Sequence, residues 1–231
     1  MNRTWNVVRM QLVNRQTFIW VPLIVLGGTF VISLSIFGLI AGNGVKIDMF
    51  GGGAQAPLWY FLAVGVQALT LTFPFSQAMS VTRREFYVGT LVTAALTSLG
   101  LAVIFVIGGL IEEATNGWGL NGYMFRLVWV WQQGPLVAGL FFFALAMLFF
   151  VVGFFFATIY KRWGSVALTS ILVGLGFVLI GIMWLVGQLQ AWPELLAWFG
   201  GLTPIGLTAS LLAATAVLAG ISYVALRRAV I

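Results

Sequence analysis

Residues 80–90, SVTRREFYVGT, form a charged cluster between two long apolar runs, and their types are spaced for a definite local structure. Thr82 and Glu85 are three residues apart, the spacing of a capping box, in which the threonine hydroxyl accepts an amide proton of the first helical turn and the glutamate reaches back. The spacing therefore predicts a short helix that begins at Thr82. Arg83 and Arg84 fall in its first turn, where the helix dipole disfavours positive charge, so membrane sidedness or a protein partner must account for them.

The groups that most enzymes use for catalysis are missing from this chain. It has no histidine and no cysteine, which removes the commonest general base, metal ligand and thiol nucleophile. Its apolar runs contain no Asp, Glu, Lys or Arg, the groups that ion-coupled transporters use, and no G-x-x-x-x-G-K-[ST] phosphate loop is present. We therefore expect no catalytic residue, cofactor or metal on this chain, and any driving energy must come from a partner.

Weakly polar residues recur in the second apolar run. Gln67, Thr70, Pro74 and Gln77 follow one another at spacings of three, four and three, which places them on one face of a regular helix. Such a strip has two interpretations that the sequence leaves open. It lines a path for a transported substrate, or it forms hydrogen bonds between neighbouring helices.

The composition is that of a membrane protein. Hydrophobic residues make up 61% of the 231 residues and charged residues 7%, with a mean hydropathy of +1.08. The formal charge of +6 does not indicate nucleic-acid binding, because the eleven Lys and Arg residues are scattered in ones, twos and threes beside the apolar runs. Membrane orientation explains their positions better.

The chain contains six apolar runs that are long enough to cross a bilayer. These runs must position the charged cluster at residues 80–90 and the polar residues of the second run. We expect an all-α integral membrane protein, a single transmembrane domain over residues 1–231, with spans at 18–40, 57–79, 90–111, 134–160, 165–189 and 204–226. Residues 161–164 form a tight turn and residues 112–133 the longest polar interruption. Residues 190–203 read as a short amphipathic outer connection.

The first residues, 2–16, read as an amphipathic helix that lies in the membrane interface. Trp5 and Leu12 fall on its apolar face with Val8, and Arg9 falls on the opposite face. The alternative is a cytosolic extension of the first span with no role of its own. The neighbouring apolar residues blur the two faces, so both interpretations stay open.

The distribution of charge orients the six spans. With the N-terminus inside, the cytoplasmic segments hold nine basic residues, and only Lys46 and Arg126 fall outside. Both termini are then cytoplasmic. Four of the five acids fall outside, at Asp48, Glu112, Glu113 and Glu194, so Glu85 is the single cytoplasmic carboxylate.

This layout, with the string TRREFYVGT after the second span, resembles the permease subunits of type 2 ABC exporters over the whole chain. The resemblance implies that residues 80–89 form a cytoplasmic coupling helix, which docks on a separate cytosolic ATPase subunit that binds ATP and Mg. Arg83, Arg84 and Glu85, with Thr82 at the cap, become the docking surface, and Phe86 and Tyr87 are expected to be its apolar anchor. One departure is the outer segment 112–133, which is more elaborate than the family usually shows.

The resemblance also implies an assembly and an activity. Two permease copies, here expected to be a homodimer, and two ATPase copies would form an exporter in the bacterial cytoplasmic membrane. The uncharged, aromatic-rich interior favours an amphipathic or lipid-like cargo, such as a drug, peptide or lipid, over a small ion. The alternative is a non-transporting membrane anchor or immunity-type subunit of a complex, and a membrane-embedded enzyme is the weakest of the three interpretations.

Overall fold

The computed structural model describes residues 3–44 and 47–227, so the expected positions of Lys46 and Arg228 lie outside the described residues. Almost all of the described chain is helical. In chain order the elements are α1 (Arg3–Val13), the π-helical turn η1 (Gln16–Trp20), α2 (Val21–Gly42), β1 (Met49–Phe50), the 3-10 turn η2 (Gly52–Gln55), α3 (Ala56–Gln67), the π-helical turn η3 (Ala68–Thr72), α4 (Phe73–Ala78), α5 (Arg83–Ala114), the wide turn η4 (Gly117–Asn121), β2 (Gly122–Tyr123), α6 (Val128–Trp131), α7 (Pro135–Gln188), α8 (Trp192–Gly200) and α9 (Pro204–Arg227).

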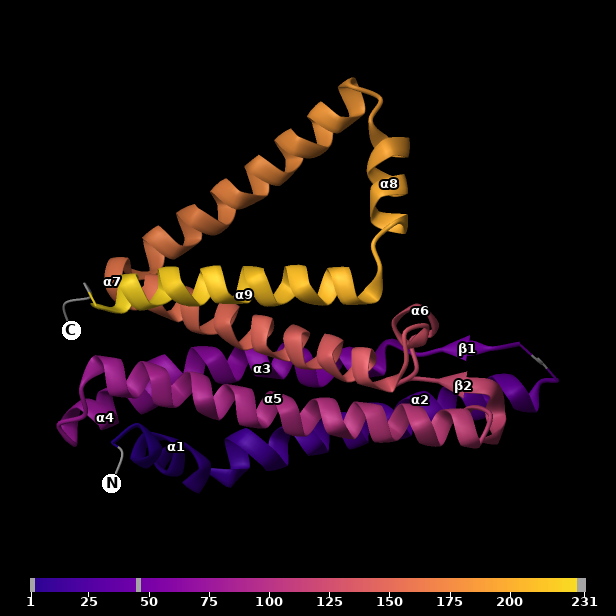
Figure 1. Ribbon diagram of the computed structural model, residues 1–231, viewed down its shortest axis with the longest axis horizontal. Helices are drawn as coiled ribbons and strands as arrows, with labels where there is room; N and C mark the ends of the chain where they lie inside the picture. The colour runs from indigo at the N-terminus through magenta and orange to yellow at the C-terminus, as the bar shows by residue number, and fades with distance from the viewer. Residues whose placement is uncertain (1–2, 45–46, 228–231) are drawn as a thin grey trace.

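Within the described residues, five helical stretches are long and apolar enough to cross a membrane, which makes the chain a multi-pass membrane protein. They cover residues 16–42, 56–78, 83–114, 135–188 and 204–227. The fourth, α7, has 54 residues and would be about 80 Å long if straight. Its path breaks at Gly164, where φ is 80° and ψ is −178°, and Figure 1 shows two arms that diverge from that bend.

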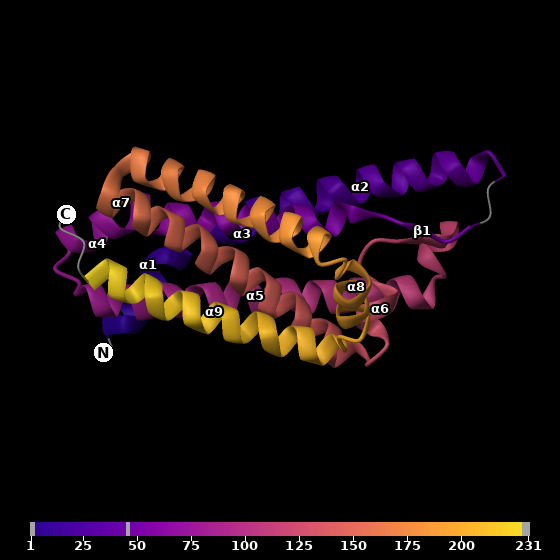
Figure 2. The same ribbon diagram turned by 90° about the horizontal axis from the view of Figure 1, so that it is seen from above.

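The two ends of the helical bundle carry different charges. One end, on the left of Figure 1 and of Figure 2, holds α1, the turn between α4 and α5, the bend of α7 and the last turn of α9. Seven basic residues belong to these elements, and we call this the basic end: Arg3, Arg9, Arg83, Arg84, Lys161, Arg162 and Arg227. The opposite end holds the β1–β2 pair, α6 and α8, with Asp48, Glu112, Glu113, Arg126 and Glu194.

The core of the bundle is built where α3 and α7 cross. A Cβ added to Gly65 of α3 would overlap the carbonyl oxygen of Phe150, and one added to Gly153 of α7 would overlap the carbonyl oxygen of Leu62. Each glycine thus admits the backbone of the other helix, the close approach that small residues allow between membrane helices. Buried phenylalanines of α3, α5 and α7 belong to the same hydrophobic core, among them Phe61, Phe105 and Phe150.

The second arm of α7, residues 165–188, leaves the bundle. Most of its residues are exposed and none is buried, and α8, which follows it, has no buried residue either. In Figure 1 this arm, α8 and α9 outline a triangle above the other helices. The arm is rich in large apolar side chains, so its surface is one that lipid or another protein chain must cover.

The predicted capping box is confirmed, but the short helix is wrong. Glu85 N donates to Thr82 Oγ1 at 3.3 Å, and Thr82 N donates to Glu85 Oε2 at 3.0 Å. The helix that begins there continues without a break to Ala114, so the expected separate elements at 80–89 and 90–111 are one helix of 32 residues. The reason is that its buried face is continuous through Gly89 and Thr90, with no proline and no change of direction between the two segments.

Candidate functional site

Phe86 and Tyr87 lie inside the bundle rather than on a docking surface. Phe86 is 0% exposed, and its ring contacts that of Phe73 at a centroid distance of 5.0 Å. Tyr87 is 6% exposed, contacts the ring of Phe154, and donates its hydroxyl proton to the carbonyl oxygen of Ala219 at 2.6 Å. These contacts correct the expectation that the two rings anchor a separate ATPase subunit.

Among the polar residues of the same stretch, Arg83 and Glu85 form hydrogen bonds within the protein, whereas Thr82 and Arg84 are exposed. Arg83 donates to the carbonyl oxygens of Leu226 and Arg227, at 3.4 Å and 3.2 Å, and so satisfies carbonyl groups at the C-terminal end of α9. Glu85 completes the capping box. Thr82 and Arg84 are exposed, and they form the part of the stretch that another protein could reach.

The N-terminal helix α1 packs closely against α5. The closest approach is at Gly89, where an added Cβ would lie 2.6 Å from the Cβ of Val7. Beside it, the Nε2 group of Gln11 donates to Thr90 Oγ1 at 2.7 Å. Residues 7, 8 and 11 are the buried ones of α1, so this helix is packed into the bundle at the basic end.

The predicted apolar face of α1 is only partly right. Val8 is buried and Leu12 is half-buried, as expected, but the Trp5 side chain is 49% exposed. Arg9 is exposed, as its place on the polar face predicted. The sequence pattern missed Gln11 because its polar side chain interrupts the apolar periodicity, whereas the structure gives it a partner on α5.

The four polar residues of the second apolar run do not form one continuous lining. Gln67 and Thr70 are half-buried, whereas Pro74 and Gln77 are exposed. The π-helical turn η3 follows Gln67, contains Thr70 and precedes Pro74, and its wider turn rotates the later residues away from the face of the earlier ones. Thr70 Oγ1 donates to the carbonyl oxygen of Val66, and Gln77 Nε2 donates to that of Val81 in the turn before α5.

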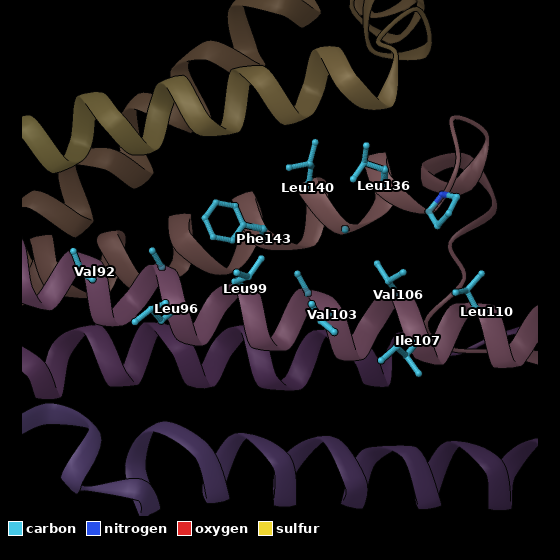
Figure 3. A pocket seen from close by; sticks show the side chains of 14 residues that line it. Val92, Leu96, Leu99, Val103, Val106, Ile107, Leu110, Leu136, Leu140 and Phe143 are labelled. Atoms are coloured by element: carbon cyan, nitrogen blue, oxygen red, sulfur yellow. The ribbon is translucent and has the colours of Figure 1, made fainter. Parts of the chain in front are cut away.

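A long apolar groove lies between α5 and the first arm of α7 (Figure 3). It has a volume of about 740 Å³ and follows the two helices from Val92, near the basic end, to Leu110 and Leu136. All fourteen lining residues are apolar, and Phe143 is the one aromatic residue among them. The groove offers no group for acid–base or metal chemistry. Its shape and lining suit a hydrocarbon chain.

The strongest polar site is at the opposite end, around Glu112. This carboxylate is 0% exposed and accepts four N–H groups, from the Trp118 indole at 3.1 Å and from the backbone of Met124, Phe125 and Arg126 at 2.8 to 2.9 Å. It holds the outer segment against the end of α5. The sequence analysis placed Glu112 in the outer polar interruption, residues 112–133. A clue was its position at the C-terminal end of a helix, where the dipole disfavours an acid unless other groups compensate.

Neither metal chemistry nor a known relative identifies a function. Within residues 3–44 and 47–227, no group of three potential Asp or Glu ligands is placed to hold a metal ion. Comparison of the chain with protein-family models, curated proteins and solved structures finds no match. The function must therefore be inferred from the geometry of the groove and of the two ends.

Proposed function

We propose that this chain is the permease subunit of an ATP-driven exporter of the type 2 ABC class, which moves an amphipathic or lipid-like cargo across the bacterial cytoplasmic membrane. The observation that carries the proposal is the groove between α5 and α7. An elongated groove lined only by apolar residues favours a cargo with a hydrocarbon chain. The same helices have no ionisable residue along the groove, so ATP hydrolysis in a separate subunit supplies the energy.

In this proposal the chain crosses the membrane six times with both termini in the cytoplasm. The bend at Gly164 supports two crossings by α7, because hydrocarbon about 30 Å thick cannot contain an 80 Å helix in one pass. The basic end faces the cytoplasm, which follows from the preference for Lys and Arg on that side.

The ATPase subunit would contact the basic end at the turn before α5. Thr82 and Arg84 are exposed there, and Met79, three residues before Thr82, is 59% exposed. Protein interfaces commonly have an apolar centre with polar residues around it, and Met79 with its polar neighbours has this arrangement. This docking surface replaces the buried Phe86 and Tyr87 of the sequence-based expectation.

Reconstitution tests the proposal. The chain purified from its native membrane should retain a cytosolic ATPase subunit in equal amount, and vesicles containing the complex should move a fluorescent phospholipid only when ATP is supplied. Arg84→Glu should lose the ATPase subunit without changing thermal unfolding, because Arg84 is exposed. Ala95→Phe, which fills the groove, should retain the ATPase subunit but reduce lipid movement to near background.

Ile32→Phe is the matched control, because Ile32 is 61% exposed on α2 and does not line the groove. It should transport like the unmodified chain. Movement of the fluorescent phospholipid without ATP would contradict the proposal. Full transport by Ala95→Phe would contradict it as well. A stable complex without any lipid movement would favour the anchor subunit instead.

We further propose that two copies pair through the arm 165–188 and α8, because this apolar surface is uncovered in the single chain. The chain lacks cysteine, so single introduced cysteines report contacts cleanly. Ile180→Cys, at a position that is 64% exposed on the arm, should form disulfide-linked dimers under oxidation. Ile24→Cys, 67% exposed on α2, is the control and should remain monomeric on gels. Complexes that hold one copy of this chain would show a heterodimer instead.

A further inference from the structure

A second pocket, different in chemistry from the groove, lies at the basic end between α1 and the second apolar stretch. Its volume is about 320 Å³. Unlike the groove, it has polar side chains in its wall: Gln11, Asn14, Thr17, Gln67 and Thr72. Charged residues do not line it, within the part of the chain that the structure describes. The pocket therefore suits a ligand that forms hydrogen bonds without a formal charge pair.

Several of these polar groups lack a partner in the protein. Gln11 is 1% exposed, and only one of its two amide atoms is paired, through the bond to Thr90. Turning the amide over exchanges the two atoms but still leaves one unpaired. Among the described residues, the side chains of Gln67 and Thr72 also have no hydrogen-bond partner. The unpaired amide atom of Gln11 is buried, so leaving it without a partner is costly, and the half-buried Gln67 and Thr72 are free to pair with a ligand in the pocket.

Two π-helical turns from different helices form this wall. η1 contributes Thr17 and Phe18, and η3 contributes Leu71 and Thr72. Single π-helical turns are rare in proteins and occur frequently at functional sites. The hydroxyl group of Tyr60 donates to the Thr17 carbonyl oxygen at 3.0 Å, which fixes η1 against α3 beside the pocket.

The rim of the pocket is apolar and open to the lipid. Leu71 is 68% exposed and Phe75 is 58% exposed, and both line the pocket. A ligand here meets hydrogen-bonding groups on one side and hydrocarbon on the other. Arg15, next in the chain to Asn14, is exposed at the same level of the bundle, where it can attract a phosphate group.

We propose that this pocket binds one membrane phospholipid, with the glycerol and ester region at Gln67 and Thr72 and the acyl chains along Leu71 and Phe75. The ligand is a lipid rather than a soluble phosphate, because the pocket wall has no cation and the rim is apolar. The proposal depends on the chain residing in a membrane, but it does not depend on transport or on an ATPase partner.

Lipid titration followed by native mass spectrometry tests this site. The purified full chain is delipidated and then titrated with phosphatidylethanolamine, phosphatidylglycerol and, separately, glycerol 3-phosphate. We expect one tightly bound phospholipid and no binding of glycerol 3-phosphate. The double variant Gln67→Leu, Thr72→Val should bind the phospholipid about tenfold more weakly, the effect of losing two hydrogen bonds.

Gln77→Leu is the matched control, since Gln77 is exposed in the same apolar stretch but does not line the pocket, and it should bind like the unmodified chain. A photoreactive benzoylphenylalanine at Leu71 should label lipid, which tests the site even if the double variant is unstable. Equal lipid affinity in the double variant, or labelling of protein at Leu71, would overturn the proposal. A site filled by water alone would bind no phospholipid at all.

Discussion

Gly65→Ala is expected to destabilise the protein by about 1–3 kcal/mol or more, the cost of inserting a methyl group into a fully packed contact. The added Cβ overlaps the Phe150 carbonyl oxygen, so α3 and α7 must separate along the crossing that forms the core. Gly153→Ala should have the same effect from the other side, through the carbonyl oxygen of Leu62. Thermal unfolding in detergent, followed by size-exclusion chromatography, measures the change.

Gly28→Ala provides the control for this comparison. Gly28 also lies in an apolar helix, but a Cβ at its position would meet no atom within 4 Å. Alanine has the higher intrinsic helix propensity, so this variant should be as stable as the unmodified chain or slightly more so. Equal stability of Gly65→Ala and Gly28→Ala would show that the two backbones do not meet as described.

Glu112→Ala is expected to destabilise the chain by at least about 3 kcal/mol, because each buried donor left unpaired costs about 1–3 kcal/mol. The substitution removes the acceptor of three backbone amides and of the Trp118 indole. The outer segment should therefore detach from α5 before the helices separate. Hydrogen exchange of residues 117–131 should accelerate strongly, while exchange at the α3–α7 crossing changes little.

Glu113→Ala tests whether the effect belongs to the buried carboxylate alone. Glu113 is adjacent in the chain, but its side chain is 51% exposed and forms one ion pair with Arg126 at 2.8 Å. Exposed ion pairs contribute about 0–1 kcal/mol. Equal losses in the two variants would mean that the outer segment depends on net charge rather than on the hydrogen bonds of Glu112.

Local features of the fold, and the fact that this is a membrane protein, can be predicted well from the sequence. Thr82 and Glu85 marked the start of α5 because capping depends on residues three apart. The tight turn expected at 161–164 coincides with the bend at Gly164, since a glycine beside two basic residues interrupts a long apolar run. The separation of acids from bases between the two ends also follows the order of the apolar runs.

The sequence could not show which faces of the helices are buried. In water, polar residues mark the exposed face, but a membrane helix is apolar on all sides, so the contrast is lost. Phe86 and Tyr87 therefore looked available for a partner although both are buried. The glycines that let α3 and α7 cross, Gly65 and Gly153, are likewise far apart in the chain, so no local spacing marks them.

The polar features were missed for a related reason. The π-helical turn η3 has no distinct residue signature, and it alone separates Gln67 from the face that carries Gln77. Glu112 looked like a surface acid because its four donors come from a loop whose conformation depends on positive φ angles at Asn116, Trp118 and Asn121. Asparagine adopts such angles more readily than most residues, but a positive φ is rare for tryptophan, so the sequence does not predict the conformation at Trp118.

The hydrogen bonds from the start of α5 to the end of α9 join two segments that are more than a hundred residues apart. Tyr87 binds the Ala219 carbonyl, and Arg83 binds those of Leu226 and Arg227, so three carbonyls over two turns of α9 are held by one turn of α5. If the proposed ATPase subunit moves the start of α5, these hydrogen bonds would move the end of α9 with it. Because α9 is joined through α8 to the second arm of α7, the proposed function would carry a movement of the basic end to that arm by way of α9.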